Sequence, residues 1–241
     1  MIFEKTSRTL GSAAVAIVLY ALMAPAASAQ EMDLRLDESI RWYTGVAGQI
    51  DNDRARELLL EVTQNAQDED ALALMWLARS FSRGRMGLPF DQERADNVAE
   101  AVLPRLRVLA DRGIREAQFL LGSANDEGIG MPENAGRAIL WFERAASRGH
   151  VLAAHNMGNA YASGRGVTQN DSLAVHWWRL AAVQGDALAQ FRMGERRENG
   201  MGIEPDLEEA IWWYRRAAGR GHGGALEALT RLGVTLEAEG N

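Results

Sequence analysis

The sequence predicts an all-α protein in which antiparallel helix pairs stack side by side into an α-solenoid. Three observations predict this fold class. The C-terminal half repeats itself without gaps at an offset of 36 residues, apolar residues recur in each unit at helical spacing, and helix-capping residues recur between the two apolar stretches. One helix pair cannot bury its own apolar face, whereas a stack of pairs buries it between neighbours.

The first 29 residues have the pattern of a secretory signal peptide. A short basic start precedes an unbroken apolar run over residues 13–24, and Ala27-Ser28-Ala29 forms a small-x-small cleavage site before Gln30. The run is too short to span a bilayer, although an uncleaved N-terminal anchor is the alternative. We therefore expect a periplasmic or secreted protein that is cleaved near Ala29/Gln30.

The composition narrows the possible partners of the mature chain. The chain has no cysteine, so helix packing rather than disulfides must stabilise an exported fold. Of 26 basic residues, Lys5 and Arg8 precede the cleavage site, which leaves 24 arginines; of 33 acidic residues only Glu4 precedes it, which leaves 32. A net charge near −8 without a basic run disfavours nucleic acid and anionic lipid as partners.

Three regular units span residues 115–150, 151–186 and 187–222, and the same residue types recur at fixed positions within them. The recurring glycines and tryptophans are Gly122, Gly158 and Gly194; Gly128, Gly164 and Gly200; Gly130, Gly166 and Gly202; and Trp141, Trp177 and Trp213. An aromatic residue follows each tryptophan, and each unit closes with an Ala-Ala pair and a glycine. We interpret all of these as structural residues of the repeat.

The spacing within one unit predicts two helices. Ala117 and Leu121 lie on one face of the first helix, and Gly122 beside them indicates close contact with another helix, since a mid-helix glycine costs about 1 kcal/mol relative to alanine. Gly128 is expected to end this helix in a left-handed conformation. Asn134 is expected to cap the second helix, whose buried face is an alanine and aromatic stripe.

The rest of the chain is less regular. Residues 30–70 are expected to form an irregular N-terminal helical pair, and residues 71–114 a degenerate repeat with a lengthened second helix that Pro104 should kink or divide. Residues 223–241 are expected to form a C-terminal capping helix and tail.

These residues resemble the Sel-1-like repeat, a relative of the tetratricopeptide repeat. The shared pattern is Ala-x3-Leu-Gly, Gly-x-Gly, an Asn or Asp cap, Ala-x2-Trp followed by an aromatic residue, and a closing Ala-Ala-x2-Gly. The resemblance implies a right-handed superhelix of antiparallel helix pairs that serves as a protein-interaction adaptor. Exported bacterial members of the family include disulfide-stapled proteins, from which this chain departs, and regulators of membrane sensor kinases.

No pattern in the sequence indicates catalysis, a cofactor or a metal. The Gly-x-Gly segments lie between helices, so we interpret them as turns rather than phosphate-binding loops. The four histidines do not have the spacing of zinc ligands: His150 and His222 occupy the same repeat position two units apart. Cysteine and Ser-x-x-Lys nucleophiles are absent from the mature chain. We therefore expect no enzyme activity, no cofactor and no metal.

In the related tetratricopeptide architecture, the first helices line the concave face. By the same register, we expect a partner-binding groove on the concave face of this chain. First-helix positions that we expect to be exposed form an aromatic floor, and two further rows are basic toward the N-terminus and acidic toward the C-terminus. These candidate residues are Phe119, His155 and Phe191; Arg79, Ser123, Asn159 and Glu195; and Arg83 and Glu127. The alternative is that the phenylalanines pack between repeats. Trp76 and Trp212 lie outside the repeat pattern, and an exposed tryptophan is a candidate binding hot spot.

The sequence thus favours a non-catalytic periplasmic scaffold that regulates or assembles an envelope protein complex. The expected partner is a protein, such as an envelope protein or a sensor ectodomain, with no nucleic acid and no membrane insertion after signal cleavage. The alternative function is recognition of a cell-wall glycan or peptide, with or without weak hydrolase activity.

Overall fold

The computed structural model describes residues 34–64 and 70–235, and this part of the chain is helical without strands. The predicted signal peptide (residues 1–29) and the end of the C-terminal tail lie outside the described residues. The elements are α2 (Leu34–Thr44), α3 (Asn52–Gln64), α4 (Ala71–Phe81), the 3₁₀ turn η1 (Arg85–Gly87), α5 (Gln92–Asp111), α6 (Arg115–Glu127), α7 (Ala135–Ala146), α8 (Val151–Ser163), α9 (Asp171–Val183), α10 (Ala187–Asn199), α11 (Leu207–Gly219) and α12 (Gly223–Arg231).

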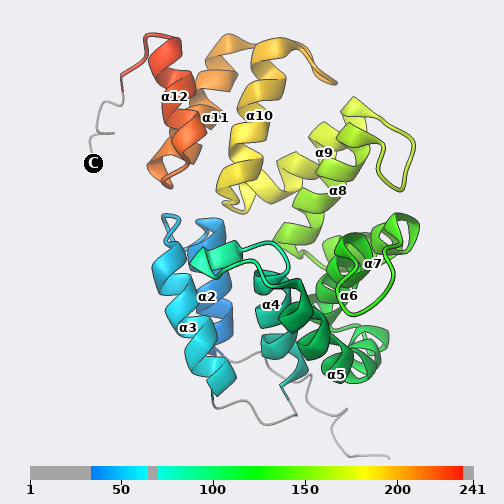
Figure 1. Ribbon diagram of the computed structural model, residues 1–241. Helices are drawn as coiled ribbons and strands as arrows, with labels where there is room; N and C mark the ends of the chain where they lie inside the picture. The colour runs from blue at the N-terminus through cyan, green and yellow to red at the C-terminus, as the bar shows by residue number, and fades with distance from the viewer. Residues whose placement is uncertain (1–33, 65–69, 236–241) are drawn as a thin grey trace, which may run out of the picture. The chain divides into compact units, whose positions relative to one another are not determined.

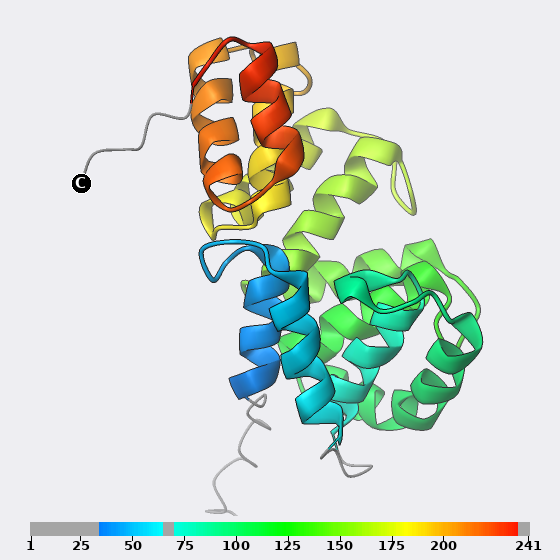
Figure 2. The same ribbon diagram turned by 60° about the vertical axis from the view of Figure 1, so that its left-hand side comes forward.

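The helices form successive pairs, as Figures 1 and 2 show. α2 packs on α3, α4 on α5, α6 on α7, α8 on α9 and α10 on α11, and α12 packs on the last of these pairs. Neighbouring pairs are joined by contacts of α5 with α6, α7 with α8 and α9 with α10. The predicted fold class, an all-α solenoid of helix pairs, is therefore confirmed.

The mid-helix glycines allow the two helices of each unit to approach closely. A Cβ atom on Gly122 would lie 2.7 Å from the Phe142 ring, and one on Gly158 would lie 2.5 Å from the Trp178 ring. In the third unit, a Cβ atom on Gly194 would lie 2.5 Å from Tyr214. These distances are too short for any real contact, so the recurring glycine is required by the aromatic residue that follows each tryptophan.

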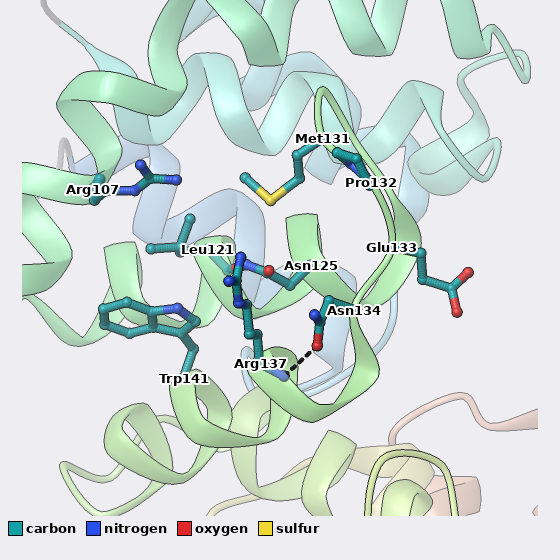
Figure 3. A pocket seen from close by; sticks show the side chains of 9 residues that line it. All are labelled: Arg107, Leu121, Asn125, Met131, Pro132, Glu133, Asn134, Arg137 and Trp141. Atoms are coloured by element: carbon teal, nitrogen blue, oxygen red, sulfur yellow. Dashed lines mark hydrogen bonds between the residues drawn. The ribbon is translucent and has the colours of Figure 1, made fainter.

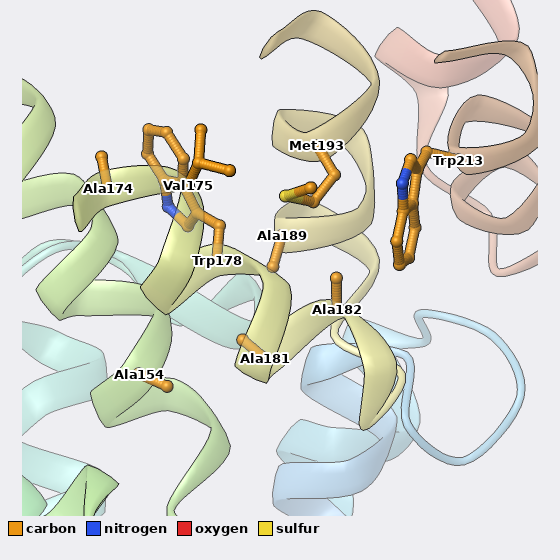
Figure 4. Close-up of a cluster of buried hydrophobic side chains, with 9 residues drawn as sticks. All are labelled: Ala154, Ala174, Val175, Trp178, Ala181, Ala182, Ala189, Met193 and Trp213. Atoms are coloured by element: carbon orange, nitrogen blue, oxygen red, sulfur yellow. The ribbon is translucent and has the colours of Figure 1, made fainter. Parts of the chain in front are cut away.

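A continuous core joins the units. Figure 4 shows one such cluster, in which Trp178 of α9, Met193 of α10 and Trp213 of α11 are buried together, with alanines where the helices approach. The core therefore runs from one pair to the next, which is the packing that a single pair cannot provide. Trp141 and Trp177 are only half-buried, however, so the expected burial of the repeated tryptophan is complete only at Trp213.

Side-chain caps begin the helices at the predicted positions. Asn134, Asn170 and Asp206 each accept a hydrogen bond from the backbone N–H three residues on, at 2.9, 3.0 and 2.9 Å. Two of the three first helices, α8 and α10, are capped as well, by residues that the sequence did not identify as caps. His150 Nδ1 accepts from Ala153 N at 3.2 Å, and Asp186 Oδ1 accepts from Ala189 N at 2.6 Å.

In the degenerate repeat, α5 is lengthened as predicted. Of the two effects expected of Pro104, a kink or a division, the division does not occur, because the helix continues through the proline. A proline has no N–H group, so Pro104 cannot donate the helical hydrogen bond to the carbonyl of Glu100, four residues earlier. Both Pro104 and Glu100 are exposed. Water can solvate that carbonyl, which explains why the helix tolerates the proline.

The N-terminal pair contacts the last regular unit. In the turn between α2 and α3, the Ile50 N–H donates to the Arg220 carbonyl at 2.8 Å, and Arg220 Nη1 donates to the Gly45 carbonyl at 2.6 Å. Gly45 has a φ of +79°, and a Cβ atom there would lie 3.2 Å from the Cβ of Ala187. Two segments far apart in the chain are therefore held together by a turn that requires glycine.

Candidate partner-binding site

A pocket of about 370 Å³, which we call the His155 pocket, lies where the N-terminal pair meets the first helices of the repeats. Its lining comes from the end of α2 and the start of α3, from α4 and η1, from α8, and from the N-terminal ends of α10 and α12. The lining residues are Tyr43, Thr44, Ile50, Asn52, Arg79, Arg85, Leu152, His155, Asn156, Asp186, Leu188 and His222.

One wall of the pocket is a buried histidine–aspartate pair. His155 Nδ1 lies 3.1 Å from Asp186 Oδ1, and both side chains are buried. The same aspartate oxygen caps α10, so the pair connects the second unit to the start of the third. The pair is therefore held by helix ends and presents fixed polar groups beside the pocket.

Two other lining residues, Arg79 and Arg85, belong to an arginine cluster around one carboxylate. Arg85 Nη1 lies 2.8 Å from Glu127 Oε2, and Arg79 and Arg83 each place Nε 3.5 Å from this carboxylate. Burial raises the pKa of Glu127, but Arg79 and Arg85 together lower it by more, so the pKa lies below its ordinary value. Three guanidinium groups share one carboxylate, which leaves the cluster with a positive surplus.

Arg79 is buried within this cluster. Its guanidinium carbon lies 5.1 Å from the ring centroids of both Trp76 and Phe119, and its Nε donates to Ser123 Oγ at 3.2 Å. Its Nη1 is buried without a hydrogen-bond partner among the described residues. Burial and the like charge of Arg85 lower the pKa of Arg79. The cluster therefore favours negative charge in this part of the pocket.

The structure corrects the expected exposure of the candidate groove residues. Phe119 is 0% exposed, because it stacks on His150 at 4.4 Å and packs against Trp76 at 5.6 Å. Ser123 and Arg79 are buried beside it, and His155 is buried against Asp186, so these four side chains do not form an exposed floor. The open alternative, phenylalanine packing between repeats, describes Phe119 correctly.

Four of the remaining five candidates are more accessible. Phe191 is half-buried and stacks on His222 at 4.5 Å, while Asn159 is exposed and accepts a hydrogen bond from the Trp178 indole. Glu195 pairs with Arg192 at 2.7 Å, and the exposed Arg83 pairs with Glu127, whose side chain is only 7% exposed, so the expected exposure of Glu127 is wrong as well. Only Arg79 and His155 of the nine candidates line the His155 pocket. Partner contact by the other candidates stays a prediction.

Sequence reasoning missed the part of the pocket that lies outside the regular units. Tyr43, Ile50 and Asn52 come from the N-terminal pair, and Arg85 from the turn after α4. The repeat register assigns no position to these residues, so no sequence signal could have placed them beside His155. Of the two tryptophans outside the repeat pattern, Trp76 is buried and donates to Glu116 at 2.6 Å, whereas Trp212 is 48% exposed.

A second pocket, of about 510 Å³, is lined by α5, α6, α7 and the loop between α6 and α7 (Figure 3). We call it the Trp141 pocket. Its lining residues are Arg107, Leu121, Asn125, Met131, Pro132, Glu133, Asn134, Arg137 and Trp141. The two pockets have no lining residue in common.

The described residues form neither a metal site nor a membrane-spanning helix. Within residues 34–64 and 70–235, no group of three or more His, Cys, Asp or Glu side chains is placed to hold a metal ion. Over the same part of the chain, no helix combines the length and apolar character that crossing a membrane requires.

The fold and its pockets define a helical repeat protein of the α-solenoid class. The family model described as "Sel1 repeat" matches residues 115–150, 151–186 and 187–222, and the chain therefore carries three Sel1 repeats. Proteins built from Sel1 repeats are generally non-catalytic scaffolds for protein interaction.

Solved structures agree with this assignment. A Sel1 repeat protein from Oxalobacter formigenes is 30% identical, with a TM-score of 0.54 over 76% of this chain and 50% of that one. A protective antigen of uropathogenic Escherichia coli with an SLR fold is 21% identical, with a TM-score of 0.53 over 84% of this chain and 50% of that one, and supports the fold alone. This chain thus spans half the length of each. A search of curated proteins gave no match.

Proposed function

We propose that this protein is a non-catalytic scaffold that acts after export, and that it regulates or assembles an envelope protein complex by binding a partner protein at the His155 pocket. The observation that carries the proposal is the pocket itself, which gathers side chains from the N-terminal pair, the degenerate repeat and the regular repeats. A volume of about 370 Å³ suits an anchoring side chain or chain segment of a partner rather than a large cofactor.

The walls of the pocket support recognition by polar groups. Asn156 and Asn52 offer amide groups, Arg85 offers a charged group, and the His155–Asp186 pair offers polar groups that the fold holds in place. Preorganised groups lose little conformational freedom when a partner binds, so they favour specific binding. Because the lining spans several units, a bound partner would also stabilise their packing.

Affinity capture with matched variants tests this proposal. Leu188 lines the pocket and is 38% exposed, so Leu188→Arg should place a bulky charge in the pocket without disturbing the core. The mature wild-type protein is expected to retain a defined set of envelope proteins, and Leu188→Arg should lose them. Leu226→Arg, at an exposed leucine of α12 outside the pocket lining, serves as the control and should retain them. Equal capture by both variants would refute binding at this pocket.

A second experiment separates protein partners from cell-wall partners. The purified mature protein is expected to stay in the supernatant when purified peptidoglycan is sedimented. Retention with the pellet that Leu188→Arg abolishes would instead support recognition of a cell-wall glycan or peptide at this pocket, and would overturn the protein-scaffold proposal.

Export has its own test. We expect the chain to be cleaved so that the mature protein begins at Gln30. Intact-mass measurement of the protein from the periplasmic fraction of an expressing bacterium checks both the location and the cleavage point. Full-length protein in the cytoplasmic fraction would contradict the expectation.

A further inference from the structure

The Trp141 pocket combines an apolar floor with two cationic side chains. Leu121, Met131 and the half-buried Trp141 supply the floor. Arg107 of α5 and Arg137 of α7 extend over it from neighbouring helix pairs, and Figure 3 shows their side chains turned toward the same hollow. The pocket is therefore suited to a ligand with an apolar part and a negative group.

The described residues supply no carboxylate to this hollow. Neither Arg107 nor Arg137 forms an ion pair with a described residue, and Trp141 Nε1 donates no hydrogen bond to one. Arg144 does not line the pocket, but its guanidinium carbon lies 4.6 Å from the centroid of the Trp141 ring. Glu133 is the one acid in the lining, but its carboxylate points away from the hollow in Figure 3 and pairs with an arginine of the next unit at 2.9 Å.

The third regular unit shows how the same position is filled elsewhere in the molecule. At an offset of 72 residues, Trp213 corresponds to Trp141, and Glu209 corresponds to Arg137. Trp213 Nε1 donates to Glu209 Oε1 at 3.1 Å, and Arg197 Nη2 lies 2.6 Å from Glu209 Oε2. The chain's own carboxylate thus bridges the repeated tryptophan and a guanidinium group in the third unit.

The first and second units lack this carboxylate for different reasons. In the second unit the corresponding residue is Leu173, which is apolar and brings no charge to Trp177. In the first unit it is Arg137, so a cation stands where the third unit has the anion. The first unit keeps the indole donor of Trp141, has Asn125 at the position of Arg197, and draws its guanidinium groups from Arg107 and Arg137 instead.

We propose that the Trp141 pocket binds an acidic segment of a partner peptide. The side-chain carboxylate of that segment accepts hydrogen bonds from Arg137 and the Trp141 indole, with Arg107 nearby, and an adjoining apolar side chain packs on Leu121 and Met131. Charge-assisted hydrogen bonds to a guanidinium group are among the stronger polar contacts in proteins. This site is separate from the His155 pocket, so a result at one does not decide the other.

Titration of the full mature protein with short blocked peptides tests the proposal. The probe is acetyl-Leu-Glu-amide, the neutral comparison is acetyl-Leu-Gln-amide, and acetyl-Leu with a free carboxyl end represents a chain terminus. The readout is the indole N–H signal of Trp141 in a ¹H–¹⁵N spectrum, assigned with Trp141→Phe. The glutamate probe is expected to shift this signal, and the glutamine probe to bind at least about tenfold more weakly.

Two charge-reversal variants provide the matched comparison. Arg137→Glu copies Glu209 of the third unit, so it should place the chain's own carboxylate in the hollow. We expect it to weaken binding of the glutamate probe at least about tenfold. Arg179→Glu makes the same charge change at an exposed position of α9 and should leave binding unchanged. Both positions are exposed, and circular dichroism checks that both variants are folded.

Three results would overturn the proposal. These are no shift of the Trp141 signal at about 10 mM glutamate probe, where a millimolar complex is mostly formed; equal binding of the glutamine probe; and unchanged binding by Arg137→Glu. Tighter binding of the chain-terminus probe would overturn the assignment to a side-chain carboxylate and assign the site to a terminal one.

Discussion

Replacing Gly158 by alanine separates helix propensity from close packing, because the two predict changes of opposite sign in the free energy of unfolding. Propensity alone predicts that Gly158→Ala stabilises α8 by about 1 kcal/mol. The structure predicts destabilisation, because the new Cβ atom would lie 2.5 to 2.7 Å from three atoms of the Trp178 indole. Carbon atoms in favourable contact are about 3.5 to 4.0 Å apart, so the ring would have to move by about 1 Å.

The size of the effect follows from what Trp178 can do. Its side chain is buried, and its Nε1 donates to Asn159 Oδ1 at 3.1 Å, so a shift of the ring disturbs both the core and a hydrogen bond. Overpacking of a core costs about 1–3 kcal/mol, and the net loss of a hydrogen bond costs about 1 kcal/mol. After the propensity gain is subtracted, Gly158→Ala should lower the free energy of unfolding by about 1–3 kcal/mol.

Urea denaturation of the mature protein, followed by far-UV circular dichroism, measures this difference. The control is Gly219→Ala, because Gly219 is the last residue of α11 and a Cβ atom there meets nothing within 4 Å. The control should be neutral or more stable by up to about 1 kcal/mol. If Gly158→Ala is as stable as the control, the recurring glycine does not serve close helix packing, and the reasoning is refuted.

Three further predictions concern individual contacts. Arg220→Ala should lower stability by about 1 kcal/mol and speed hydrogen exchange in the α2–α3 turn, because the bond to the Gly45 carbonyl is lost; unchanged exchange there would contradict it. Glu127→Gln should lower stability by about 3 kcal/mol in urea denaturation, because buried arginines lose their carboxylate, and a neutral result would show that water already screens them. Burial lowers the pKa of His222, and the charge of Arg192 lowers it further. The contribution of the neutral His222 to the free energy of unfolding is therefore fully present above about pH 6.5 and is lost as the pH falls through the lowered pKa. His222→Asn should keep the cap of α12 and remove this part of the pH dependence of the urea midpoint; an unchanged pH dependence would contradict the prediction.

The repeat pattern allowed much of the fold to be predicted from the sequence. A helix cap such as Asn134 and a helix end such as Gly128 act on the residues next to them, so their residue types are informative by themselves. Gly122 indicated close helix contact for the same reason, since its partner Phe142 lies in the same unit. Interactions within one unit recur with the sequence and can be read from it.

The exposure of particular side chains could not be predicted in this way. Phe119 has the register of a concave-face residue, yet it is buried against Trp76 of the preceding degenerate repeat and against His150 at the end of its own unit. Residues of the same repeat position also differ in what surrounds them, as Arg137 and Glu209 do. Register assigns a face of a helix, whereas the neighbouring units decide what covers that face.

The sequence by itself determined that the chain forms helix pairs, where most of those helices begin and end, and that three of the pairs are copies of one unit. Only the tertiary structure decided that Arg220 meets the turn at Gly45, and that the His155 and Trp141 pockets exist. The physical reason is the range of the interactions. Caps and helix periodicity depend on nearby residues, whereas a contact between residues 175 positions apart depends on the packing of every unit between them.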